Sequence, residues 1–242
     1  MCWSSEASIV LSTIGVTGTL YAAYKKQPLV LWMSLGYFTL MEILQAFTYG
    51  VIDQCHDPSN QVATILGYLH IVFQPFFIHA VALHFIPQDT ARRIAPLVFT
   101  LCFFCSIMML LTLYPFSWAG LCPEHFPLCS DHLCSVSGNW HIAWNVPLNL
   151  ELKGLRYYPW IGMVLPFLYG SWRFGTYHFL MGPLLAYSTT DNINEFPAVW
   201  CLLSIGFLLI IVETPVRRIL YVEKTWLDRF FKKKDEATPS QN

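Results

Sequence analysis

Charged residues are scarce in this chain. Asp, Glu, Lys and Arg make up 12% of its 242 residues, whereas 55% of the residues are hydrophobic. Soluble domains carry about 25% charged residues, because their surfaces face water. The shortage argues against a soluble globular protein. It indicates an all-α, polytopic membrane protein, in which the lipid-facing surface is as apolar as the core.

Motifs of several functional classes are also missing. No G-x-S-x-G, Walker or dinucleotide-binding pattern occurs. The last hydrophobic segment has no lysine, which excludes a retinal Schiff base in its usual place. The basic residues provide no argument for nucleic acid as a partner. The N-terminus, Met1 to Glu6, lacks the pattern of a removable signal peptide, so we expect the first hydrophobic segment to stay in the protein.

Seven hydrophobic runs are long enough to cross a bilayer, which takes roughly 20 helical residues. The predicted spans are 7–24, 28–49, 61–86, 94–114, 157–172, 175–190 and 196–214. The fifth and sixth are short and closely joined, so one long kinked helix and six spans in all is the alternative. Seven spans with the N-terminus outside and the C-terminus inside place 12 of the 14 Lys and Arg residues on the inner side, as the positive-inside rule requires.

This topology gives two regions, a transmembrane domain over 1–214 and a basic inner tail over 215–242. The tail mixes lysines and arginines with aromatic residues, which indicates an anchor that sets the topology or, as the alternative, an amphipathic helix in contact with anionic lipids. The bilayer itself is the principal predicted partner. We expect a multi-pass protein of the plasma or inner membrane.

Four cysteines fall in the predicted outer loops, the longer of which covers 115–156. They are Cys55, Cys122, Cys129 and Cys134. On an oxidising side, four loop cysteines suit two disulfides that join the loop after span two to the loop after span four. The alternatives are free thiols and a zinc site, because C-x2-H-x3-C-x2-H-x-C offers five potential ligands.

Polar side chains inside predicted spans are costly, so each is a candidate for function. Glu42 lies in the second span, with Gln45 and Tyr49 on the same helical face, and His70 and Gln74 share a face of the third. Glu42 and His70 each lie about eight residues from the loop that joins the two spans, so we expect them to meet at a similar depth.

This geometry predicts a catalytic set in which Glu42 accepts a proton, His70 is its partner and Gln74 orients them. The substrate would be lipophilic, such as a lipid or an isoprenoid. Gln45, Tyr49 and His141 are the predicted binding residues. A Glu42–His70 pair that only fixes helix packing is the alternative.

A second group lies near the predicted inner face. His84 ends span three, His178 begins span six and Glu213 ends span seven. Two histidines and a carboxylate can bind a metal with open positions, and one haem between the two histidines is a further possibility. For Glu213, pairing with Arg217 along one helix is the plain alternative.

Three hypotheses of function therefore stay open. They are an intramembrane site that binds or converts a lipophilic substrate, a transporter or receptor-like bundle, and a metal- or haem-binding membrane protein. The sequence names no cofactor for any of them.

The run GSWRFGTYHFLMGPLLAYSTTDNINEFPAVWCLLSIGFLLI, residues 170–210, resembles an uncharacterised family of bacterial-type seven-pass integral membrane proteins. That family has no assigned activity. The resemblance therefore implies a topology and no reaction.

Overall fold

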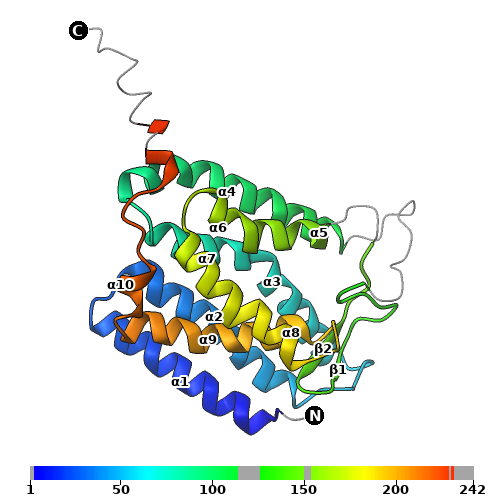
Figure 1. Ribbon diagram of the computed structural model, residues 1–242. Coiled ribbons are helices and arrows are strands. Elements are labelled where there is room, and N and C mark those ends of the chain that lie inside the picture. The colour runs from blue at the N-terminus through cyan, green and yellow to red at the C-terminus, as the bar shows by residue number, and fades with distance from the viewer. Residues whose placement is uncertain (1–2, 114–125, 150–153, 229, 232–242) are drawn as a thin grey trace, which may run out of the picture.

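The computed structural model describes residues 3–113, 126–149, 154–228 and 230–231. Five long helices lie side by side in it (Figure 1). They are α1 (Ser5–Tyr24), α2 (Leu29–Thr48), α3 (Pro58–His84), α4 (Gln88–Leu111) and α9 (Phe196–Glu213). Among the described residues, these five are long and apolar enough to cross a membrane.

Two further helical rods complete the bundle. The first consists of α5 (Gly154–Pro159), η1 (Trp160–Val164) and α6 (Leu165–Leu168), and the second of α7 (Trp172–Phe179), η2 (Leu180–Leu184) and α8 (Leu185–Thr189). The middle of each rod is a π-helix. Proline accompanies both, because Pro159 precedes η1 and Pro183 lies inside η2, and a missing N–H disturbs the regular α-helical pattern.

The rods are separate helices, which rules out the alternative of one long kinked helix. Gly170 divides them with a φ of +97°, a conformation that side chains other than glycine rarely adopt. A Cβ at Gly170 would also come within 2.8 Å of Thr225. Ser171 then donates to the carbonyl of Ala82 at 2.7 Å, which fixes the turn to the end of α3.

The helices run alternately between two ends of the bundle (Figure 1). We call one the cap end. It carries the N-terminus and an antiparallel hairpin of β1 (Cys134–Ser137) and β2 (Ile142–Asn145), with Cys134 opposite Asn145. The other, the tail end, carries residues 25–28, 85–87 and 169–171 together with α10 (Val216–Leu220). The sequence predicted no strands, and these two are a small addition to a mainly helical fold.

Helix α1 packs closely on its neighbours through small residues. A Cβ at Gly15 would lie 2.4 Å from Thr39 Oγ1 of α2, and a Cβ at Gly18 would lie 2.5 Å from Leu209 of α9. Small residues let helices approach this closely. The approach places Ser8, at the start of α1, fully buried against the bundle.

Helix α3 begins three residues earlier than predicted. Asp57 caps it, because its carboxylate accepts from the backbone N–H of Ser59 at 2.7 Å, and Pro58 suits the first helical position. Every residue of α3 therefore lies deeper in the bundle than the predicted start at residue 61 implied.

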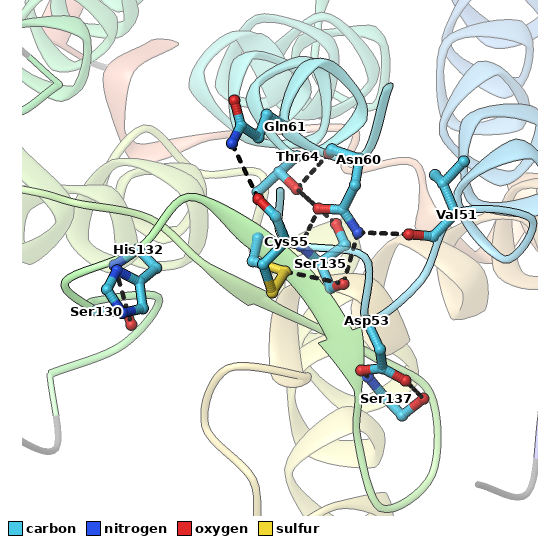
Figure 2. Close-up of a disulfide and its surroundings, with 11 residues drawn as sticks. Val51, Asp53, Cys55, Asn60, Gln61, Thr64, Ser130, His132, Ser135 and Ser137 are labelled. Carbon is cyan, nitrogen blue, oxygen red and sulfur yellow. Dashed lines mark hydrogen bonds between the residues drawn. A yellow bond between two sulfur atoms is a disulfide. The ribbon is translucent and has the colours of Figure 1, made fainter. Parts of the chain in front are cut away.

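The hairpin is fixed by a disulfide to the loop before α3 and by one asparagine to α3 itself (Figure 2). Cys55 and Cys134 form the disulfide, across 79 residues of sequence. The Asn60 amide donates to the carbonyl of Ser135 at 2.9 Å and accepts from its N–H at 2.9 Å. It also donates to the carbonyl of Val51 at 2.8 Å. Asn60 therefore bonds to β1 as a neighbouring strand would.

The tail end is held by the segment that follows α9. Arg173 donates to the carbonyls of Ile219 and Tyr221 at 3.1 and 3.0 Å, and Trp226 donates to the carbonyl of Leu168 at 3.0 Å. The N–H of Val222 bonds to Phe85 at 2.8 Å. The predicted inner tail thus packs, in its described part, across the ends of several helices.

Candidate functional site

His141 lies at the centre of a buried polar cluster at the cap end. Its Nε2 is 2.8 Å from Gln45 Oε1, and its Nδ1 is 2.6 Å from the hydroxyl of Tyr49. Gln45 and Tyr49 are four residues apart near the end of α2, so they share one face. His141 comes from the hairpin turn. The structure therefore brings together the three predicted binding residues.

The partners of His141 define its protonation. Gln45 Oε1 can only accept, so Nε2 carries the proton, and Nδ1 accepts from Tyr49. Burial lowers the pKa of His141 to about 3, because the charged imidazolium form is disfavoured away from water. His141 is thus a neutral hydrogen-bonding link between the hairpin and α2.

Glu42 lies one turn below Gln45 and is fully buried. The indole N–H of Trp3 lies 2.9 Å from Ser8 Oγ and 3.4 Å from Glu42 Oε1. Trp3 covers the carboxylate, since its ring stacks on Trp140 at 5.5 Å and its backbone N–H bonds to the Trp140 carbonyl at 2.9 Å. Glu42 Oε2 and Gln45 Nε2 have no hydrogen-bond partner among the described residues.

A second buried carboxylate fixes the other side of the turn. Glu195 accepts from the backbone N–H of Trp140 at 3.1 Å and from the hydroxyl of Thr190 at 2.6 Å. A Cβ at Gly138 would lie 1.7 Å from Glu195 Oε1, so only glycine fits there. Glu195 thus joins the hairpin to the segment between α8 and α9.

Glu42 and His70 are not hydrogen-bonded to each other in the described structure, and their catalytic roles stay a prediction. His70 stacks on Tyr37 at 4.0 Å, and the Tyr37 hydroxyl bonds to its backbone carbonyl. Tyr37 precedes Glu42 by five residues, which is about 8 Å along a helix. His70 is therefore at a greater depth than Glu42, because α3 begins earlier than expected. Its Nε2 is buried without a partner among the described residues.

Gln74 lies next to the π-helical part of the bundle. The hydroxyl of Tyr158 donates to its Oε1 at 2.7 Å. Below it, His79 Nε2 bonds to the carbonyl of Ile161 at 2.8 Å. The Ile161 carbonyl lacks a donor from its own helix. The backbone N–H of Leu165 bonds to the Trp160 carbonyl instead, and Pro166 has no N–H. Gln74 therefore belongs to a helix-packing contact, separate from Glu42.

An apolar cavity lies beside these residues, between the two π-containing rods and α9. Its volume is about 520 Å³. Met163, Tyr158, Phe196 and Trp200 line it, and Tyr187, which is 75% exposed, stands at its rim. Cavities of roughly 300–1,000 Å³ are typical of small-molecule sites.

The cavity has few polar groups. Thr190 lines it and joins it to the cap cluster through Glu195. Asp191 also lines it. The indole Nε1 of Trp200 is buried against Gly182 and does not open into the cavity. The arrangement can hold a mainly apolar molecule.

The predicted metal site is wrong. His178 is buried among Phe174, Trp200 and Phe207, with ring centroids 5.5–5.7 Å away, and His84 and Glu213 lie in separate pockets at the tail end. The described residues contain no group of three potential ligands. The three side chains fall on different helices that face different neighbours, which their similar predicted depth could not reveal.

The cysteines follow the disulfide prediction where they are described. The Cys55–Cys134 bond joins the loop after α2 to the segment after α4, and Cys129 also takes part in a disulfide. Neither Cys129 nor Cys134 is thus available as a zinc thiolate. Cys122 lies outside the described residues.

Several residues of the cap and the cavity were missed from the sequence. Trp3, Asn60 and Trp200 carry contacts across more than 30 residues of sequence or line a cavity, and no local pattern signals either role. Glu195 offered one signal, as an acid placed directly before an apolar helix in a chain with few charges.

Comparison with known proteins places the chain in a family without assigning an activity. No curated protein and no solved structure matches it. A family model described as a family of unknown function (DUF5765) matches residues 6–221, which cover all the helices and the hairpin described above. The chain therefore belongs to this uncharacterised family.

Proposed function

We propose that this protein is a seven-pass integral membrane protein that binds a lipophilic molecule in the cap-end cavity. The five long apolar helices support membrane insertion, and the two π-containing rods would be the remaining passes. Eight of the nine described Lys and Arg residues lie at the tail end, Arg156 being the exception. That bias favours an inner tail end and an outer, disulfide-bonded cap.

The cavity next to Trp200 is the observation that carries the proposal. Its walls are mainly apolar, and its rim residue Tyr187 belongs to the exposed face of the bundle, so a molecule could enter sideways from the lipid. The apolar body of the ligand would fill the space between Met163 and Phe196.

Binding is better supported than catalysis. Among the described residues Glu42 has no histidine partner to exchange a proton with, and its contact to Trp3, which also bonds to Ser8, ties the start of the described chain to the bundle. The proposed role of Glu42, Gln45 and His141 is therefore to hold the cap closed above the cavity.

The proposal is tested by extracting bound molecules from the purified protein. Met163→Trp places a large ring in the cavity and is expected to abolish retention of the ligand. Met33→Trp, on the exposed face of α2, is the matched control and should retain it. If both variants carry the same molecules as the unaltered protein, the cavity is not the binding site.

A further inference from the structure

A groove at the tail end combines a positive head with an apolar trough. It lies between α2, α3 and α4 and has a volume of about 300 Å³. His84, Gln88 and Arg92 form the head, where α3 ends and α4 begins. No Asp or Glu lines the groove.

The trough extends from this head toward the middle of the bundle. Val30, Ala80, Ala95 and Phe99 line it, and the ring of Phe99 stacks on Phe76 of α3 at 6.2 Å. Residues 92, 95 and 99 follow one face of α4, so the trough is about 10 Å long. The trough exists because Ala80 and Ala95 have small side chains.

The electrostatics of the head favour an anion. Arg92 is exposed and makes no hydrogen bond to the described residues. Helix α4 also begins here without a side-chain cap, because Pro87 occupies the cap position. Asp89, the acidic residue of that first turn, does not line the groove.

We propose that this groove binds one anionic phospholipid. Its phosphate contacts Arg92 and Gln88, and the upper part of one acyl chain lies in the trough. The site is distinct from the cap-end cavity and from the tail, although it rests on the proposed membrane insertion. Basic pockets between membrane helices on the inner side bind such headgroups in this way.

The trough identifies the source of the phosphate as a lipid. A soluble phosphate would fill only the head and would leave Ala95 and Phe99 uncovered. The exposed surface of α4 beyond the groove is apolar as well, since Phe103, one turn after Phe99 on the same face, is 54% exposed. An acyl chain would continue along that surface.

The test is the lipid retained by the whole protein in nanodiscs of equal phosphatidylcholine and phosphatidylglycerol, counted by native mass spectrometry after release. One phosphatidylglycerol per chain is expected in preference to phosphatidylcholine. Arg92→Gln should lower that preference about fivefold, the effect of one cationic group at a membrane surface. Ala95→Leu fills the trough and should lower the preference for phosphatidylglycerol without removing charge.

Arg218→Gln is the control, because it removes the same charge at the same end outside the groove. An equal loss in this variant would assign the preference to overall charge and overturn the groove site. Displacement of the lipid by excess inorganic phosphate would point to a soluble ligand and overturn the lipid. Failure of the protein to enter the nanodiscs would instead contradict the proposed membrane insertion, and retention of the cavity ligand reports on that site independently.

Discussion

The two ends of the bundle are closed in different ways. At the cap end a disulfide, the amide of Asn60 and the buried carboxylate of Glu195 hold the hairpin. At the tail end exposed groups such as Arg173 hold the chain through bonds to backbone carbonyls. Buried bonds are costly to leave unmade, whereas exposed ones are readily replaced by water. We therefore expect the cap to be the more rigid end and the tail end to be the more adaptable one.

Removing the Cys55–Cys134 disulfide should have the largest effect on this contrast. The double variant Cys55→Ser, Cys134→Ser should lose about 2–4 kcal/mol of stability, because the disulfide closes a long loop. Thermal unfolding in mild detergent measures the loss. Cys102→Ser, at a free cysteine of α4, is the control. Equal unfolding temperatures for the double variant and the unaltered protein would show that the disulfide does not stabilise the cap end.

Asn60→Ala should come next. It leaves the N–H and the carbonyl of Ser135 buried without this partner, at a cost of about 2 kcal/mol. Asn139→Ala changes the same residue type in the exposed part of the hairpin turn and should have little effect. Denaturation of both variants under the same conditions is the measurement. Similar losses would show that Asn60 does not fix the hairpin.

His141 should make the cap sensitive to acid. Its pKa of about 3 in the folded protein lies below the value of about 6.5 in an unfolded chain. The unfolded state therefore takes up the proton first as the pH falls. The contribution of His141 is complete above pH 6.5 and declines toward pH 3, by at most about 1.4 kcal/mol per pH unit.

Unfolding measured between pH 7 and pH 4 checks this expectation. His141→Gln should flatten the dependence of stability on pH, whereas the exposed His132→Gln should leave it unchanged. An identical slope in His141→Gln and the unaltered protein would contradict the account of the cap cluster.

Arg173→Ala should have the smallest effect. Its two bonds to Ile219 and Tyr221 are exposed, so we expect a loss of about 0.5–1 kcal/mol. Hydrogen exchange should become faster in residues 216–228 and stay unchanged in the hairpin. Lys224→Ala is the matched charge control. A loss as large as that of Asn60→Ala would mean that the two ends are closed equally firmly.

The sequence predicted the helices well and the contacts between them poorly. Runs of apolar residues located α2 within one residue at each end, and the loop cysteines predicted the link between the loops after α2 and α4. The depth of His70 was wrong because the cap at Asp57 starts α3 earlier than hydrophobicity indicates. Hydrophobicity reports where a helix crosses lipid, whereas capping side chains decide where it begins.

The candidate site was predicted in part. Helical periodicity placed Gln45 and Tyr49 on one face of α2. His141 was singled out separately, and its contact with that face is a long-range contact that the structure supplies. The cavity could not be predicted, because its walls come from α3, the π-containing rods and α9. Helical periodicity does not specify which helix faces pack tightly and which leave a cavity between them.

The most direct test of the proposed function is photo-crosslinking with a lipophilic diazirine probe in native membranes, followed by peptide mapping. We expect the adducts to concentrate on the cavity residues Met163, Ile193 and Phe196, above those on surface-exposed Leu40. The extract of bound molecules should compete for the cavity adducts alone. Adducts spread evenly over all exposed apolar residues, with no competition, would contradict a binding site in the cavity.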